Sequence, residues 1–113
     1  MRASVAIDAG ICGFHTQAYA TGHDNRTVTL ELDSDCEKIT RLGHVLRQAG
    51  PIDAYHEISP VGKSVMLETA RSVLQGCCAG CAVPIGLFKC MQVAAGLALP
   101  KDIRIHLSKD RNE

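Results

Sequence analysis

The feature that most constrains the fold is an alternation of apolar and polar residues that occurs three times in the first third of the chain. It covers residues 2–7, 14–20 and 27–32, and the third copy, with Val28, Leu30 and Leu32 on one side, is the clearest. This period of two is typical of half-buried strands, and the Gly-, Asp- and Asn-containing segments between the copies are typical of turns. The sequence therefore predicts a three-stranded antiparallel meander with one face open to water.

Three helices are expected after the meander. Ser34 and Glu37 match a capping box, which predicts a helix that begins at residue 34 and ends before Gly50-Pro51. Ser59-Pro60 is typical of a second helix start, and that helix would run to about Gly76. Pro84 would begin a third helix that reaches about residue 96 and is apolar on nearly every side. Residues 52–58 are compatible with either a loop or a short edge strand.

The C-terminal segment repeats the strand pattern once more. Ile103, Ile105 and Leu107 alternate with Arg104 and His106, and residues 108–113 are polar. We expect this segment to be a strand that completes a four-stranded sheet. The predicted fold is a single α+β domain over residues 1–113, a two-layer sandwich with the three helices on one face of the sheet.

Composition excludes some classes of partner. Twelve basic residues balance twelve acidic ones, and aromatic residues make up only 4% of the chain, which disfavours nucleic acid as a partner. The N-terminus lacks the pattern of a signal peptide, and the apolar run from Gly76 to Gln92 is short and interrupted, which disfavours a membrane span. We expect a cytoplasmic protein whose six cysteines remain reduced.

The cysteines are the residues that ask for a chemical explanation. Three of them, Cys77, Cys78 and Cys81, lie within five residues between two apolar helical segments. Cys12 follows the first strand and Cys36 follows the third, so chain direction alone places both at the end of the sheet to which the second helix returns. Five cysteines are thus expected to converge at one end of the molecule, while Cys90 would lie inside the third helix, in the core.

Two helix N-termini, one before Cys36 and one after Cys81, would point at this cluster and favour thiolates. Four thiolates from Cys12, Cys36, Cys77 or Cys78, and Cys81 suit either zinc or an iron–sulfur cluster. The leading hypothesis is a metal-binding protein for cluster carriage, electron transfer or metal sensing.

Two alternatives are open. Cys78 and Cys81 have the spacing of a redox dithiol, which would indicate a thiol–disulfide oxidoreductase. The other is an interaction module with buried structural cysteines, which would bind a protein partner or pair as a homodimer through an edge strand. No acid–base pair accompanies the thiols, so no catalytic residue is predicted and enzymatic activity is an open question.

The sequence shows two resemblances to known proteins. Asp8-Ala9-Gly10-Ile11-Cys12-Gly13-Phe14, Cys77 to Pro84 and Gly96-Leu97-Ala98-Leu99-Pro100 resemble an uncharacterised family of small cysteine-containing proteins of anaerobic prokaryotes. That resemblance implies an α+β domain and favours cysteines at positions 12, 36, 77 and 81 as the ligands. Separately, Cys78-Ala79-Gly80-Cys81 before a helix is similar to the C-terminal domain of iron–sulfur scaffold proteins.

Overall fold

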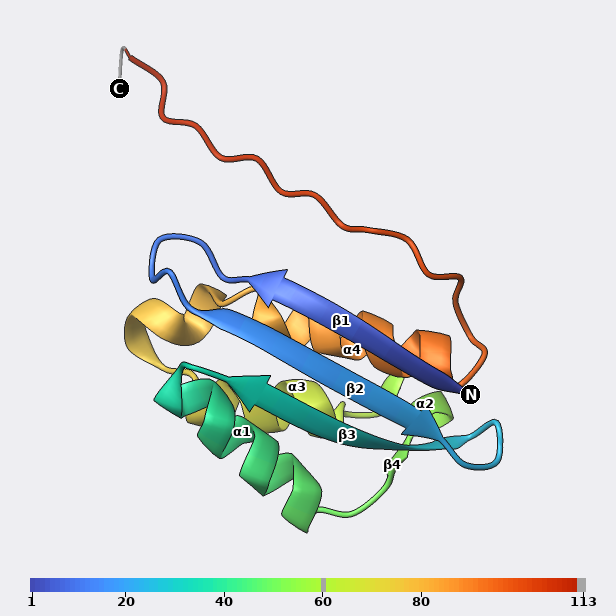
Figure 1. Ribbon diagram of the computed structural model, residues 1–113. Coiled ribbons are helices and arrows are strands. Elements are labelled where there is room, and N and C mark those ends of the chain that lie inside the picture. The colour runs from blue at the N-terminus through green and yellow to red at the C-terminus, as the bar shows by residue number, and fades with distance from the viewer. Residues whose placement is uncertain (60, 112–113) are drawn as a thin grey trace.

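A four-stranded antiparallel sheet forms one layer of the computed structural model, which describes residues 1–59 and 61–111 (Figure 1). Its strands are β1 (Arg2–Asp8), β2 (His15–Gly22), β3 (Thr27–Ser34) and the two-residue β4 (Ile52–Asp53), in the spatial order β1-β2-β3-β4. The predicted meander is therefore confirmed.

The register of the sheet explains the alternation in the sequence. Val5 lies opposite Ala18, and Ala18 lies opposite Leu32, so the apolar residues of the three long strands share one face. On that face Ala18, Ala20 and Val28 are completely buried, and Leu30 nearly so. Val5 and Leu32 pack against this core from its rim.

Helices cover the apolar face of the sheet and leave the other face open (Figure 1). They are α1 (Glu37–Gln48), α2 (Ala54–Glu57), α3 (Val65–Val73), the 3₁₀ turn η1 (Gly76–Gly80) and α4 (Val83–Ala94). Ile39, Leu42, Leu87 and Met91 are among the largest side chains that they bury. The predicted α+β class, with its helical layer on one face, is confirmed.

The first helix begins later than the capping box predicted. Ser34 is still part of β3, opposite Thr16, and the two hydroxyls are 2.9 Å apart. The N-cap of α1 is Cys36, whose side chain makes no capping hydrogen bond. Pairing of Ser34 with β2 thus holds it in the sheet, and the prediction that it caps the helix is wrong.

The second helix also starts later. Its N-cap is Ser64, whose Oγ accepts a hydrogen bond from the backbone N–H of Leu67 at 3.0 Å. Val61, which was expected inside the helix, lies before it and is exposed, and Pro60, which was expected at its first position, lies outside the described residues. Residues 52–58, left open by the sequence, form β4 followed by the single turn α2.

The C-terminal segment is not a strand of this sheet. Residues 101–110 have no regular secondary structure, and the chain leaves the body beyond α4 as an extended tail (Figure 1). The fourth strand is instead β4, which pairs with the far edge of β3 through Val28 and Ile52. The prediction that residues 103–107 complete the sheet is therefore wrong.

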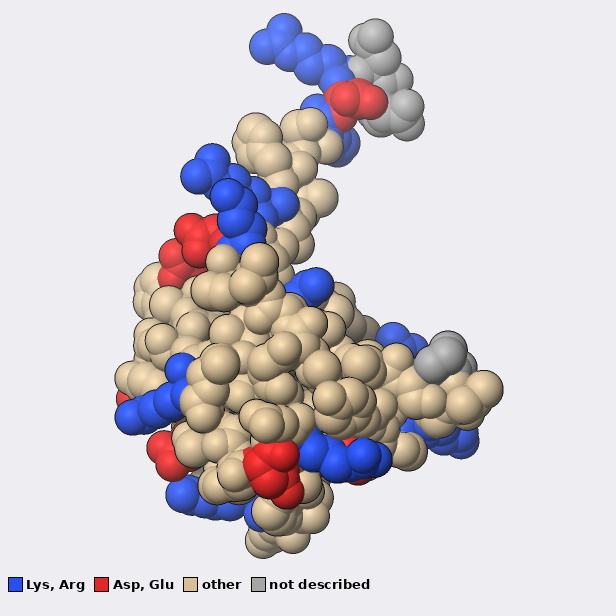
Figure 2. All heavy atoms as spheres, turned by 90° about the vertical axis from the view of Figure 1, so that its right-hand side faces the viewer, with Lys and Arg blue, Asp and Glu red and all other residues tan. Residues whose placement is uncertain are grey.

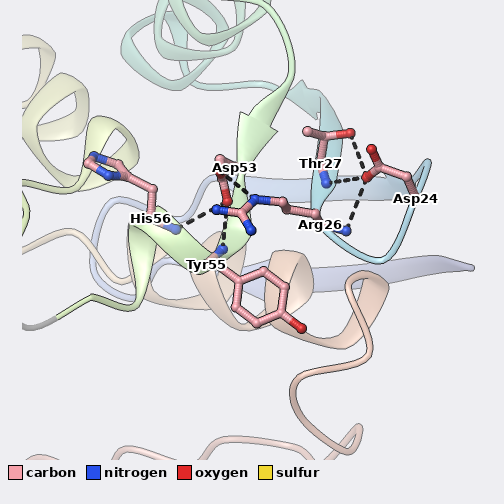
Figure 3. A network of polar contacts seen from close by, with 6 residues as sticks. All are labelled: Asp24, Arg26, Thr27, Asp53, Tyr55 and His56. Atoms are coloured by element: carbon pink, nitrogen blue, oxygen red, sulfur yellow. Dashed lines mark hydrogen bonds and ion pairs between the residues drawn. The ribbon is translucent and has the colours of Figure 1, made fainter.

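A polar network holds the end of the sheet where β4 meets the turn between β2 and β3 (Figure 3). Asp24 Oδ1 accepts hydrogen bonds from the backbone N–H of Arg26 at 3.1 Å and of Thr27 at 2.7 Å. Arg26 Nε donates to Asp53 Oδ2 at 2.9 Å, and the other oxygen of Asp53 caps α2 by accepting from Tyr55 and His56. These hydrogen bonds keep the pKa of both aspartates below its ordinary value of 3.8.

One stretch, Gly76–Ala94, is long and apolar enough to cross a membrane by length and composition. Here it is divided between η1 and α4, with Cys81 and Ala82 between the two. In α4 the side chains of Leu87, Cys90 and Met91 are buried against the rest of the core. The position of α4 as the core helix accounts for its apolar composition.

Candidate functional site

Five cysteines gather at the end of the sheet opposite the network around Asp53. We call Cys12, Cys36, Cys77, Cys78 and Cys81 the cysteine pole. Figure 1 shows how the chain builds it: the arrowhead of β1, the junction of β3 with α1, and the segment that joins α3 to α4 lie at the same end of the molecule. Cys12 follows β1, Cys36 follows β3, and the other three lie in or directly after η1.

Burial and other cysteines of the pole affect the ionisation of Cys81. Partial burial raises the pKa of Cys81 above its ordinary value of 9.0, and a hydrogen bond from the backbone of Val83 acts in the opposite direction. Negative charge on Cys12, Cys36 or Cys78 would raise this pKa further. Segments that carry cysteines up to 69 positions apart in the sequence thus lie at the same end of the molecule (Figure 1).

Three pole cysteines rest on the edge of the core. Cys36, Cys78 and Cys81 are half-buried and pack against the buried cluster. Cys36 is the N-cap of α1. Cys81 directly follows η1, and its backbone N–H donates a hydrogen bond to the carbonyl of Cys78 at 3.1 Å. The two residues of the Cys-x-x-Cys pair are therefore held one turn apart by the backbone.

A lysine from α1 reaches across to η1. Lys38 Nζ donates a hydrogen bond to Cys78 Sγ at 3.5 Å, although 40 residues separate the two in the sequence. An ammonium group in this position partly balances negative charge that collects on the sulfurs. No sequence pattern indicated this contact, because Lys38 has the position of an ordinary solvent-exposed residue in the first turn of a helix.

The other two pole cysteines, Cys12 and Cys77, are exposed. Cys12 lies in a turn between Gly10, with φ of 98°, and Gly13, with φ of 74°. Backbone conformations of this kind are open to glycine and strained for other residues, so the glycines shape the turn that carries Cys12.

Cys90 is separate from the pole, as predicted. It lies in α4 with 4% of its surface exposed, and burial raises its pKa above the ordinary value of 9.0. Its role is that of a small apolar side chain in the core.

The cysteine pole does not have the geometry of a metal-coordination site in this structure. All six cysteines are free thiols. Within residues 1–59 and 61–111, no three side chains of His, Cys, Asp or Glu are arranged closely enough to hold a metal ion. Binding of a metal would therefore require side-chain rotation and movement of the turns that carry the thiols.

A contact that sequence reasoning missed lies beside the turn of Cys12. Asp8 and His15 are opposite each other in the register of β1 and β2, and Asp8 Oδ1 is hydrogen-bonded to His15 Nδ1. This hydrogen bond and the charge of Asp8 raise the pKa of His15 above 6.5, and Asp35, which accepts from the backbone N–H of His15 at 2.8 Å, adds to the effect. The strand register could have revealed the pair, since both residues flank the same turn.

Fold and site together define a small α+β protein with thiols gathered at one end of an antiparallel sheet. A family of unknown function, DUF6951, matches residues 3–107, and the chain belongs to this family. The expected resemblance to an uncharacterised family is confirmed to that extent. No curated protein and no solved structure matches the chain.

Proposed function

We propose that this protein binds a metal, either zinc or an iron–sulfur cluster, through thiolates of the cysteine pole. The observation that supports this most is that the ends of β1 and β3, followed by Cys12 and Cys36, lie at the same end of the molecule as the segment that carries Cys77, Cys78 and Cys81 (Figure 1). Packing alone does not require several thiols at the surface end of a sheet. Four thiolates are the donor set that suits tetrahedral zinc and iron–sulfur clusters, and carriage of a cluster, electron transfer or metal sensing are the roles open to such a site.

Within this proposal we take Cys78 in preference to Cys77 as the fourth ligand. Cys78 is half-buried and is one of the residues whose charge affects Cys81, whereas Cys77 is exposed. Lys38 also contacts Cys78. The local likeness of Cys78-Ala79-Gly80-Cys81 to iron–sulfur scaffold proteins agrees with this choice of pair.

Mutual repulsion among thiolates explains what a cation would add. Without a metal, partial burial and the negative charge of a neighbouring thiolate both oppose ionisation of Cys81, whose pKa is raised above 9.0, so this thiol remains largely protonated near neutral pH. A bound metal reverses this repulsion, and its binding must release protons. Cys12 lies in an exposed turn, where a rearrangement toward the half-buried thiols disturbs little of the core.

The first test is purification without oxygen, followed by an absorption spectrum and elemental analysis. Brown protein with iron and sulfide would identify a cluster, and colourless protein with one zinc per site would identify a zinc centre. Zinc added to metal-free protein in weakly buffered solution should release protons, with a tetrahedral thiolate geometry in the cobalt-substituted form. Protein that neither retains nor takes up a metal contradicts the proposal.

Serine variants then test the ligand set. Cys36→Ser, Cys78→Ser and Cys81→Ser should each lose metal, while Cys77→Ser retains it. Cys90→Ala is the matched control, because its thiol is buried away from the pole. If Cys77→Ser loses the metal and Cys78→Ser retains it, the choice of fourth ligand is wrong but metal binding stands.

A thiol–disulfide oxidoreductase that uses Cys78 and Cys81 is the second candidate, favoured by their separation of one backbone turn. The raised pKa of Cys81 opposes it, because a reactive dithiol needs a thiolate at neutral pH. Metal-free protein in which both residues are alkylated rapidly, and in which they form a disulfide on oxidation, would favour this alternative.

A further inference from the structure

The C-terminal tail exposes apolar side chains that would usually be buried. Beyond α4 the chain extends away from the body through residues 98–111 (Figures 1 and 2). Ile103, Ile105 and Leu107 are 51%, 71% and 87% exposed. They alternate with polar residues, and the match to the family reaches residue 107, so the pattern is part of the family's domain. Alternation of this kind is typical of a segment that becomes a strand when it pairs with a sheet edge, although residues 103–107 form no strand within this chain.

The body offers an edge where such a strand fits. β1 is the outermost strand, and in the described residues no strand pairs with its second edge, so backbone N–H and C=O groups are available along Arg2–Asp8. α4 lies over β1 here, because a Cβ on Gly86 would meet the side chains of Ile7 and Val5. The neighbouring Ile85 is 51% exposed. An added strand would therefore find backbone partners on β1 and an apolar contact on α4.

We propose that residues 103–107 of one copy pair with the β1 edge of a second copy, and that the exchange is reciprocal. Each chain supplies one unpaired strand and one unpaired edge, so a twofold dimer satisfies both with the same contact made twice. The tail begins close to the start of β1, because Gly22 lies against both Ala94, at the end of α4, and Met1, just before β1. The tail nevertheless does not pair with β1 of the same chain and extends away from the sheet (Figure 1).

The net charges of the tail and of the rest of the chain are compatible with pairing between two copies of this protein. Residues 101–111 contain four basic and two acidic side chains, a net charge of +2, and basic side chains follow the projecting tail in Figure 2. Residues 1–100 contain eight basic and nine acidic side chains, a net charge of −1. A second body therefore attracts the tail weakly, and the apolar face of the tail supplies most of the association.

The test is the mass of the full chain in solution, measured by light scattering or sedimentation with the thiols kept reduced. The monomer mass is 12.1 kDa, and we expect the wild type to have twice that mass. Ile105→Asp places a charge on the apolar face of the tail and should weaken association more than tenfold, giving a monomer. His106→Asp is the matched control, since it introduces the same residue on the opposite face and should remain dimeric. The helical signal in circular dichroism should be retained in both variants, which shows that the body stays folded.

Hydrogen exchange identifies the edge that receives the tail. Backbone amides of β1 should exchange more slowly in the wild-type dimer than in the Ile105→Asp monomer, and those of β3 should not differ. A monomeric wild type overturns the proposal, as does a dimer that Ile105→Asp leaves intact. Equal exchange of the β1 amides in dimer and monomer also overturns it, because the tails would then pair with each other or with another surface.

Discussion

Asp8 and His15 close the turn that carries Cys12. Their side chains are hydrogen-bonded to each other on the open face of the sheet. The backbone N–H of His15 donates to the side chain of Asp35, the residue that follows β3. The turn between β1 and β2 is thus attached at its base to β3. Both residues are exposed, so the effect on stability is small and the effect on titration is the one to measure.

Asp8→Asn should lower the pKa of His15 toward its ordinary value of 6.5, because the hydrogen bond to a carboxylate and the nearby negative charge are its main causes. A folded-state pKa above 6.5 means that the pair stabilises the fold below pH 6.5, and that this contribution is lost as pH rises through the raised value. NMR titration of the histidine ring protons gives the shift directly. Asp33→Asn is the control, and an unchanged pKa in Asp8→Asn would contradict the assignment.

Burial of Cys90 should make the stability of the fold depend on pH in the alkaline range. Its folded-state pKa is raised by burial, so the neutral thiol stabilises the fold below pH 9.0, and this contribution is lost as pH rises above that value. Cys90→Ala should be about 1 kcal/mol less stable at pH 7 and should lose less of its stability than the wild type between pH 8 and 10.5. Urea unfolding across this range measures both effects. The exposed Cys77→Ala should follow the wild-type profile.

Among the elements, α3 depends on a carboxylate that lies outside it. Glu57, at the end of α2 and only 5% exposed, accepts hydrogen bonds from the backbone N–H groups of Val65 and Met66 at 2.7 and 2.8 Å. Ser64 Oγ donates to the same carboxylate at 2.7 Å. The start of α3 is therefore fixed by α2 and by Ser64 together.

Glu57→Ala should destabilise the protein by about 1–3 kcal/mol, because it leaves buried backbone N–H groups at the start of α3 without an acceptor. Urea unfolding measures the loss. Glu68→Ala, an exposed acidic residue in the first turn of the same helix, should cost less than about 1 kcal/mol. Equal losses in the two variants would show that Glu57 acts only through its charge.

This contact also shows why the start of α3 could not be predicted from the sequence. The sequence pattern predicted the helix start at Ser59-Pro60, whereas α3 begins after Ser64, where Glu57 of another element accepts hydrogen bonds from the Ser64 hydroxyl and the first backbone N–H groups. Helical spacing in the sequence predicts that Ile39, Leu42, Leu46 and Ala49 share one face; the first three are buried in α1, whereas Ala49 is its exposed C-cap. The start of α1 was not predicted correctly, because Ser34 remains paired in the sheet.

At the scale of the whole molecule, alternation predicts a strand but not its partner. The first three strands are consecutive, so short turns supply their partners. The pattern at Ile103, Ile105 and Leu107 is of the same kind, yet within one chain it has no neighbour. The convergence of the cysteines could be foreseen because chain direction needs no side-chain detail, whereas Lys38 beside Cys78 could be found only from the packing of α1 on η1.

A metal at the pole should stabilise the whole fold, because its ligands would join the β1–β2 turn, the start of α1 and η1. At a free zinc concentration about 100 times the dissociation constant, the gain is about 2.7 kcal/mol, or roughly 10 °C or more in Tm for a domain of this size. Thermal unfolding with and without zinc measures it. Cys81→Ser should abolish the gain and Cys90→Ala should preserve it, whereas an equal gain in both would indicate binding elsewhere.

The thiols of the pole lie on turns, a helix cap and a 3₁₀ segment, outside the long strands and helices of the described chain. Three of them are partly buried and pack against the core, and the other two are exposed. The cysteines of the pole are thus structurally separate from the strands and helices that form the core. An imidazole or a carboxylate in place of one of these thiols would therefore alter the surface of the pole and leave the interior unchanged.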